Sequence, residues 1–159
     1  NDKFNPVNED WDARDIDPEK VERVIFCSGK VYYDLRAERS ARGIQNLPLV
    51  RMAQLYPFAH DEFRAQIVRY KNAKEIVWCQ EEPRNQGAWR HIQHYLMRYL
   101  LPHQQLYYAG RDSSASPAAG YKSLHEKQQK ELVDQALTLA GGSAPRQFTP
   151  RPLTAGEEN

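Results

Sequence analysis

The stretch "EIVWCQEEPRNQGAWRHIQHYLMRYLL", residues 75–101, contains in succession the patterns of a strand, a polar loop and a helix. Residues 75–80 form a short, mostly apolar run, which is typical of a strand buried inside a sheet. Residues 89–101 repeat apolar side chains at helical spacing, and Pro102 ends the pattern. A strand followed closely by a helix is the unit from which parallel α/β sheets are built.

The same alternation extends along the chain in both directions. Strand patterns are expected at residues 21–28, 47–58, 75–80 and 105–111, and helical patterns at residues 30–42, 61–70, 89–101 and 124–140. Gly43 follows the first helix where a left-handed C-cap residue is expected, and Gly141 follows the last. The sequence therefore predicts an α/β fold in three layers, with helices on both faces of a mostly parallel sheet.

Length and composition limit the organisation of the chain. Its 159 residues suffice for one domain with a core. Its 22 basic and 21 acidic side chains nearly balance, so neither a nucleic acid nor an anionic membrane is expected as a partner. Residues 1–20 are polar and rich in turn formers, and they are expected to connect to a preceding domain. The domain itself is expected at residues 21–140, and residues 141–159 are expected to be disordered.

Other features of the sequence bear on its cellular context. It shows no leader and no apolar run long enough to cross a membrane, which favours a cytoplasmic protein. Cys27 and Cys79 each lie in an apolar run, so both are expected to be small buried thiols and not a disulfide. The chain starts without methionine, and together with the connector this favours a piece of a longer polypeptide.

Basic side chains are the first candidates for a binding site. In open parallel sheets, ligands lie beside the loops that follow the carboxyl ends of the strands. We expect Lys30, Lys74 and Arg111 near that edge, and Arg42 at the far end of the first helix. Lys30 lies in the short "SGK" loop, which could present an ammonium group and backbone N–H groups to a phosphate. These residues are candidates for an anion site, and a set of solvated bases is the alternative.

The loop at residues 81–89 carries two adjacent carboxylates, Glu81 and Glu82. Adjacent side chains that leave a strand point in opposite directions, so the two acids are poorly placed to share a proton or to flank one bond. Pro83 also favours an extended conformation at Glu82. We therefore expect both acids to accept backbone or arginine hydrogen bonds and to shape the loop, with Gly87 permitting a tight turn and Trp89 anchoring the next helix.

Neither a metal centre nor a nucleophile is assembled by the sequence pattern. His91 and His94 lie three residues apart on an expected helix, but no acidic or cysteine ligand appears at helical spacing from them. Ser113, Ser114 and Ser116 lack the glycine-flanked turn of an activated serine. The residues by themselves indicate a polar edge that makes contacts and performs no chemistry.

Four longer strings carry a resemblance to a known family. "FCSGKVYYDL", "LVRMAQLYPF", "VWCQEEPRNQGAW" and "YYAGRDSSASPAAGYKSLHEKQQKELVDQAL" occur in order in this chain. In order and spacing they resemble the carboxy-terminal domain of the thiamine diphosphate-dependent component of 2-oxoglutarate dehydrogenase, over residues 21–139. Gln86 and Ala88 favour 2-oxoglutarate over the alternative substrate 2-oxoadipate.

The resemblance implies a transketolase-type C-terminal domain, in which one strand is usually antiparallel. The whole bacterial, cytoplasmic enzyme would decarboxylate 2-oxoglutarate on thiamine diphosphate and Mg²⁺ and pass the succinyl group to lipoamide, as part of the tricarboxylic acid cycle. Both groups would be held by preceding domains, so this piece alone is expected to be inactive. The implied partners are a second copy in a homodimer, dihydrolipoyl succinyltransferase and dihydrolipoyl dehydrogenase.

The resemblance also suggests roles for individual residues. One set is expected to form a structural and interface loop: Glu81, Glu82, Asn85, Gln86, Gly87 and Trp89. A second set matches positions at which some relatives bind the activator acetyl-coenzyme A: Cys27, Lys30, Arg42, Lys74 and Arg111. The pattern in those relatives has threonine in place of Cys27 and two arginines in place of Gly110 and Arg111. A stand-alone α/β module that binds a small molecule or a nucleotide is the alternative function.

Overall fold

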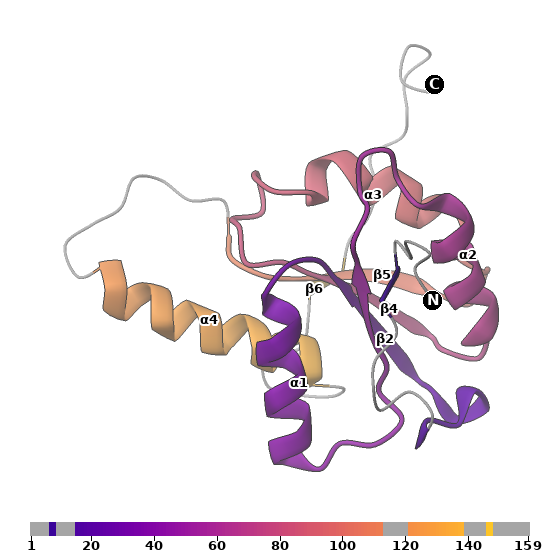
Figure 1. Cartoon of the computed structure of the whole chain (residues 1–159), viewed down its shortest axis with the longest axis horizontal. Helices are drawn as coiled ribbons and strands as arrows, with labels where there is room; N and C mark the ends of the chain where they lie inside the picture. The colour runs from indigo at the N-terminus through magenta and orange to yellow at the C-terminus, as the bar shows by residue number, and fades with distance from the viewer. Residues whose placement is uncertain (1–6, 9–14, 113–120, 139–145, 148–159) are drawn as a thin grey trace, which may run out of the picture.

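The computed structural model describes residues 7–8, 15–112, 121–138 and 146–147, and its centre is one twisted sheet (Figure 1). The strand order is β1-β3-β2-β4-β5-β6. The four longer strands are parallel: β2 Arg23–Cys27, β3 Leu49–Met52, β4 Glu75–Cys79 and β5 Gln105–Ala109. The two-residue strands β1, Val7–Asn8, and β6, Arg146–Gln147, pair antiparallel at the two edges. The sheet is therefore mostly parallel, as predicted.

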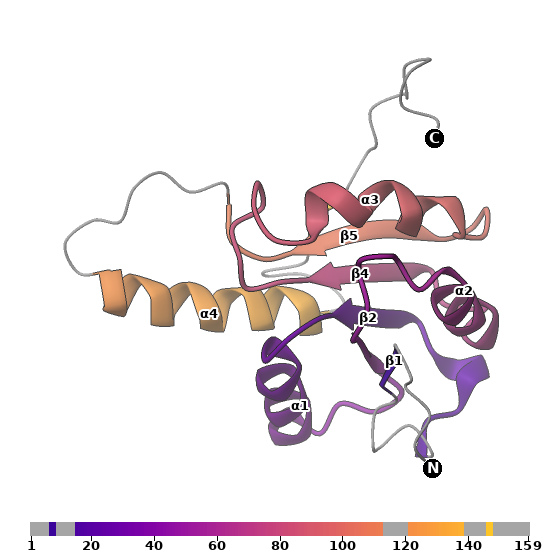
Figure 2. The ribbon, with the colours of Figure 1, turned by 45° about the horizontal axis from the view of Figure 1, so that its top comes forward.

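Helices cover both faces of the sheet (Figure 2). The four α-helices are α1 Val31–Arg42, α2 His60–Arg69, α3 Trp89–Arg98 and α4 Tyr121–Leu137, and a short 3-10 helix, η2, spans Pro18–Lys20. Helices α1 and α4 lie on one face, and α2 and α3 lie on the other. This arrangement confirms the predicted three layers.

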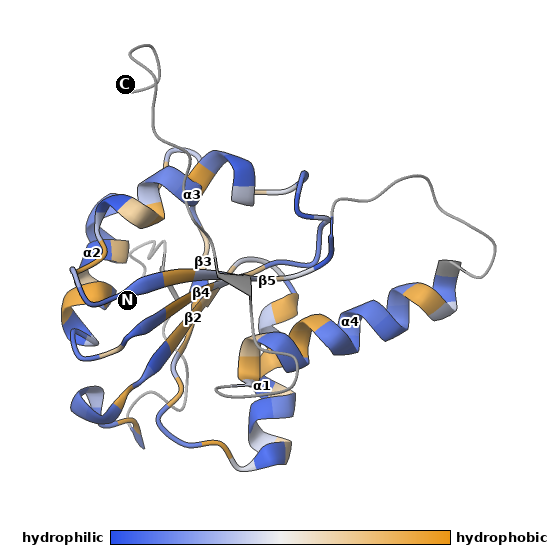
Figure 3. Ribbon diagram, turned by 180° about the vertical axis from the view of Figure 1, so that it is seen from behind, coloured by the Kyte–Doolittle hydropathy of each residue, from blue (hydrophilic) through white to orange (hydrophobic). Residues whose placement is uncertain are grey.

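Alternation along the buried strands separates the core into two halves. In β2, Val24 and Phe26 pack under α2 and α3, whereas Ile25 and Cys27 face α1 and α4. All five residues of β2 are buried, because helices cover both faces of a parallel sheet. Figure 3 shows that apolar colour is concentrated on the strands and the inner sides of the helices, whereas the projecting half of α4 is mostly hydrophilic.

The expected elements are present, and their boundaries differ in places. The strand expected at residues 47–58 covers only Leu49–Met52, because the chain then turns at a bridge between Leu55 and Phe58. Gly43 adopts the expected left-handed conformation, with φ 64°, and its N–H binds the last carbonyls of α1. The expectation of one antiparallel strand also differs from the described residues, in which two short edge strands are antiparallel.

The strand order fixes where the chain reverses direction across the sheet. From β2 the chain passes through α1 to β3 on one side, and then through α2 to β4 on the other side of β2. The carboxyl ends of β2 and β4 therefore form the topological switch point, where α/β proteins commonly bind ligands. The loop with Glu81 and Glu82 begins there.

Several predictions from the sequence concern residues that the structure does not describe. The disorder expected at residues 141–159 lies outside the described residues, apart from Arg146–Gln147 in β6, and so do Ser113, Ser114 and Ser116. Most of the connector expected at residues 1–20 is likewise not described. In the part of the chain that is described, no helix is both long enough and apolar enough to cross a bilayer.

Candidate functional site

The loop after β4 is organised around the buried side chain of Gln80, which is 2% exposed. Its Oε1 accepts hydrogen bonds from Trp78 Nε1 at 2.9 Å and from the backbone N–H of Trp89 at 3.1 Å. Its Nε2 donates to three loop carbonyls, those of Glu82 at 3.1 Å, Pro83 at 3.1 Å and Gln86 at 2.9 Å. One amide thus connects the end of β4, the loop and the first residue of α3. Sequence reasoning did not identify Gln80, although it stands at the start of the loop.

The loop closes through a tight turn at Gly87, as expected. Gly87 has φ 66°, a left-handed conformation that side chains rarely adopt. A Cβ atom there would lie 3.0 Å from Cβ of Glu82, so the position has both a conformational and a steric reason for glycine. The backbone N–H of Gln86 donates to the Pro83 carbonyl at 2.8 Å within the same turn. Trp89, 2% exposed, anchors the start of α3 against Tyr108, as its ring centroid lies 5.0 Å from that of Tyr108.

Arg111, in the loop after β5, connects this loop to α4. Its guanidinium donates to the Glu81 carbonyl oxygen, to Gln129 Oε1 at 2.9 Å and to the His125 carbonyl at 3.1 Å, and it lies 3.2 Å from His125 Nδ1. The Arg111 carbonyl in turn accepts from Arg84 N at 3.0 Å. The side chain and backbone of Arg111 therefore connect the loop after β4, the loop after β5 and helix α4.

The two carboxylates of the loop do not form an acid/base pair. Glu81 Oε1 accepts a hydrogen bond from Gln129 Nε2 at 2.8 Å, and the same nitrogen donates to Asp34 Oδ2 at 2.8 Å. Glu82 instead lies beside Gly87 and is exposed. The donor to Glu81 is a side-chain amide, whereas the sequence analysis expected a backbone or arginine donor. The structural interpretation of this loop agrees with these contacts.

The basic candidates are not brought together at one edge. Lys30 follows β2 and Arg111 follows β5, so both lie at the carboxyl ends of the strands. Lys74 precedes β4, and its N–H donates to the Glu22 carbonyl at 3.0 Å before the sheet begins. The expectation that Lys74 shares an edge with Lys30 and Arg111 is therefore wrong, because Lys74 comes before its strand and the other two come after theirs.

Arg42 and Cys27 are both engaged within the fold. Arg42 forms ion pairs with Glu38 at 2.9 Å and with Asp134 at 2.9 Å, and its hydrogen bonds to Glu38 and Asp134 raise its pKa above the ordinary arginine value. Cys27 is fully buried and lies opposite Cys79 in the register of β2 and β4. Both cysteines are reduced thiols, as expected, and burial raises the pKa of Cys79 well above its usual value.

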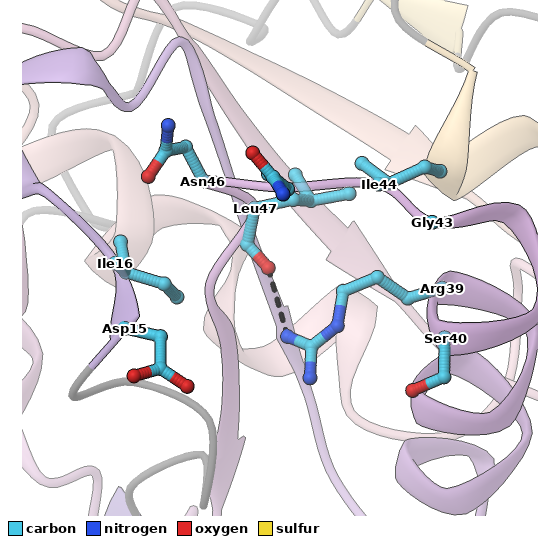
Figure 4. Close-up of a pocket in the computed structure, with 9 residues that line it drawn as sticks. Asp15, Ile16, Arg39, Ser40, Gly43, Ile44, Asn46 and Leu47 are labelled. Atoms are coloured by element: carbon cyan, nitrogen blue, oxygen red, sulfur yellow. Dashed lines mark hydrogen bonds between the residues drawn. The ribbon is translucent and has the colours of Figure 1, made fainter.

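Two cavities lie on the α1 side of the molecule. One, of about 360 Å³, lies between the segment at Asp15 and Ile16 and the turn after α1, with the buried guanidinium of Arg39 donating to the Leu47 carbonyl at 2.9 Å (Figure 4). The other, of about 500 Å³, lies between α1 and α4 and has Arg42 among its lining residues. Arg39 carried no signal in sequence, because α1 also contains Arg36 and Arg42 and the pattern does not show which arginine is buried.

His60, His91 and His94 belong to an aromatic cluster. Among the described residues, no three His, Cys, Asp or Glu side chains are grouped so as to hold a metal ion. The rings of His94 and Tyr95 are tilted by 41° with centroids 4.0 Å apart, and the ring centroids of His91 and Tyr56 are 4.6 Å apart. Burial, and then the charge of Arg98, lower the pKa of His94 below the ordinary histidine value.

Comparison with known proteins identifies the family. The family model described as "2-oxoglutarate dehydrogenase C-terminal" matches residues 1–137. The chain belongs to this family. The 2-oxoglutarate dehydrogenase E1 component of Azotobacter vinelandii is 48% identical over 86% of this chain and 14% of its own length. That of Cupriavidus necator is 50% identical over 82% of this chain, again 14% of its own length.

A solved structure shows the same fold at low sequence identity. A protein titled "Split gene transketolase, inactive beta4 tetramer" superposes with a TM-score of 0.51 and 19% identity, over 76% of this chain and 41% of the other. The chain resembles that protein in fold, as expected for a transketolase-type domain. This member of the 2-oxoglutarate dehydrogenase C-terminal family spans about a seventh of the length of the curated relatives it matches, 14% for the two above.

Proposed function

We propose that this chain is the C-terminal domain of a bacterial 2-oxoglutarate dehydrogenase E1 component. The complete protein would decarboxylate 2-oxoglutarate oxidatively and transfer the succinyl group to lipoamide in the tricarboxylic acid cycle. The names of the relatives support this activity, and the identities of 48% and 50% over most of the chain support a shared role. Gln86 and Ala88 favour 2-oxoglutarate over 2-oxoadipate as the substrate.

The hydrogen bonds of the Gln80 side chain are the observation that supports a structural and interface role for this domain. These five hydrogen bonds hold the loop in one shape while Glu82, Asn85 and Gln86 stay exposed. A polar loop that is fixed from inside and exposed outside is suited to contact another protein surface. In this proposal the loop belongs to the contact with the rest of the homodimer, and residues 1–20 connect to the preceding domain.

Thiamine diphosphate and Mg²⁺ belong to the proposal for the complete enzyme. The described residues offer no cluster of carboxylates or histidines that fits a metal ion, so no catalytic step is assigned to them. Both groups would be bound by segments outside this chain. Dihydrolipoyl succinyltransferase and dihydrolipoyl dehydrogenase would be the partners of the complete enzyme, and the bacterial cytoplasm its location.

Two substitutions in the complete enzyme test the role of the loop. Trp89→Ala removes a core aromatic side chain and should cost about 3 kcal/mol, so the dimer or the fold should weaken in sedimentation and unfolding measurements. Glu81→Gln keeps the shape of the side chain and should lower turnover of 2-oxoglutarate by less than about tenfold. Loss of all turnover in Glu81→Gln with unchanged assembly would show that the carboxylate is catalytic. Consumption of a 2-keto acid by the 159 residues alone would overturn the proposal as a whole.

Regulation by acetyl-coenzyme A or a nucleotide remains a separate proposal. Lys30 and Arg111 lie at the carboxyl edge, and Arg42 lines the cavity between α1 and α4, so Cys27 and Lys74 would contribute only indirectly. Calorimetry of the complete enzyme with acetyl-coenzyme A should show heat of binding, weakened by Arg42→Ala. No heat and no activation would dismiss the effector. The alternative of a stand-alone binding module has no support among the relatives, which are named E1 components.

A further inference from the structure

A long segment of the chain contains no acidic side chain. Residues 83–111 include four arginines and three histidines but no Asp or Glu, although 21 of the 159 residues are acidic. The segment covers the loop after β4 from Pro83 onward, the whole of α3 and the whole of β5. Arg90 and Arg98, in the middle of the segment, therefore have no acidic neighbour within several residues along the chain.

Helix α3 presents these cations on its outer side. Trp89, Ile92 and Leu96 are buried against the sheet. Arg90, His94 and Arg98 follow one another at intervals of four residues, so they form a stripe along another side of the helix. Arg90 and Arg98 are exposed, and neither makes an ion pair within the described part of the chain.

Aromatic rings lie beside the stripe. Tyr56, in the loop before α2, is 63% exposed and contacts His91, with ring centroids 4.6 Å apart. Tyr95 lies between His94, whose ring centroid is 4.0 Å away, and the Arg98 guanidinium, 5.5 Å from the Tyr95 ring. Exposed Tyr and Arg side chains are enriched in protein interfaces, where the ring supplies contact area and the guanidinium binds carboxylates in pairs of hydrogen bonds. We call these residues the α3 surface: Tyr56, Arg90, His91, His94, Tyr95 and Arg98.

We propose that the α3 surface binds an acidic segment of a partner protein. The unpaired arginines supply the charge complementarity, and Tyr56 and Tyr95 supply apolar contact area beside it. A second copy of this surface is a poor partner, since a two-fold contact would bring arginines toward arginines. Nucleic acid is also a poor partner, because the chain has a net charge of only +1 and the stripe holds few cations for a phosphate backbone.

The test uses the complete protein that contains this chain, and it measures binding, so its result does not depend on the proposed enzymatic activity. The probe is a fluorescein-labelled peptide of alternating Glu and Leu, and its anisotropy is measured at low and at physiological salt. We expect saturable binding that weakens with salt, and the double substitution Arg90→Glu with Arg98→Glu should weaken it at least tenfold. Tyr56→Ala should weaken it several-fold.

A matched control separates this surface from the total charge of the protein. Lys122→Glu with Lys127→Glu makes the same change in charge on the exposed part of α4, and peptide binding should stay within twofold of the parent protein. All four positions are exposed, so circular dichroism should show that each variant folds. Equal weakening by both double variants would overturn the proposal, as would equal binding of the peptide with Gln in place of Glu. The proposal would also be overturned if the protein bound an oligothymidylate more tightly than the peptide and if that binding were lost in the double variant at Arg90 and Arg98.

Discussion

At the scale of single residues, Gln80 shows why an amide and not a carboxylate follows β4. The site requires an acceptor for two N–H groups and a donor for three carbonyls, and an amide supplies an oxygen with two lone pairs and a nitrogen with two hydrogens in one side chain, whereas a carboxylate only accepts. An apolar side chain of the same size would leave these buried groups without partners. Glu82 can then stay exposed, because the amide and not a carboxylate holds the loop together.

Gln80→Leu should therefore destabilise the chain by about 3 kcal/mol, since several buried polar groups lose their hydrogen bonds at once. The free energy of unfolding in urea measures the change. Gln86→Leu is the matched control, because that side chain is exposed, and it should change stability by less than about 0.5 kcal/mol. Equal effects of the two variants would show that the loop is not organised by Gln80.

His94 gives a prediction on pH. Burial lowers its pKa in the folded chain, so the folded state binds a proton less readily there than the unfolded chain does. The stability contributed by neutral His94 is present above the unfolded value of about 6.5 and is lost as the pH falls toward the lowered folded pKa. His94→Gln should lose less stability than the parent chain between pH 7.5 and 5.5, as measured by urea midpoints. Identical losses would contradict the assigned shift.

At the scale of elements, Gly43 ends α1 and Gly87 lies in the turn before α3. Both have a left-handed backbone conformation, but for different reasons. Gly43 has φ 64° with no atom within 4 Å of an added Cβ, and Gly87 has φ 66° with Glu82 in the way. The first position is therefore restricted by conformation alone. The second is restricted by conformation and by packing.

Alanine at the two positions should separate these costs. Gly43→Ala should destabilise the chain by about 1 kcal/mol, the usual cost of a left-handed residue with a Cβ. Gly87→Ala should cost more, about 2 kcal/mol, because the Glu82 side chain must also move. Thermal or urea unfolding of both variants measures the difference. A smaller effect at Gly87 would contradict the close contact with Glu82.

At this scale, the sequence predicts those features whose signals lie within a few residues of one another. Gly43 and the boundaries of α1 and α2 were predictable to within one residue, because caps and apolar spacing act within a few residues, whereas the C-terminal end of α3 and both ends of α4 differ from the prediction by up to three residues. The short length of β3 was not predictable, because residues 47–58 are mostly apolar and the turn at Leu55 and Phe58 depends on neighbouring elements. Gln80 and Arg39 were missed for the same reason, since their partners are set by packing and leave no pattern in the sequence.

At the scale of the whole molecule, the edge of the sheet at which a loop residue lies depends on whether that residue precedes or follows its strand. Lys74 was placed at the wrong edge because it precedes β4, whereas Arg111 follows β5. The resemblance supplied the family, which the comparisons confirm. The contacts that connect distant parts of the chain, such as Gln129 to Asp34 and Glu81, come only from the structure.

Arg23 is the long-range contact with the clearest consequence. It is 1% exposed in β2 and donates to the carbonyls of Ala136, at 2.9 Å, and Thr138, at the end of α4. It also forms an ion pair with Glu75 of β4 at 2.7 Å. Helix α4 is buried only near this end, and its other half projects beyond the sheet (Figure 2). One arginine therefore satisfies the free carbonyls of α4 and connects that helix to the sheet.

Arg23→Met should destabilise the chain by about 3 kcal/mol, since it leaves Glu75 and the helix carbonyls without their donor. Hydrogen exchange should show the loss chiefly in the last turn of α4, because that is where the carbonyls lie. Glu75→Gln keeps an acceptor for the guanidinium and should leave the protection of α4 unchanged. If exchange in α4 stayed the same in Arg23→Met while stability fell, the arginine would be supporting the sheet alone, and the attachment of α4 would rest on its apolar residues Leu132, Val133, Ala136 and Leu137.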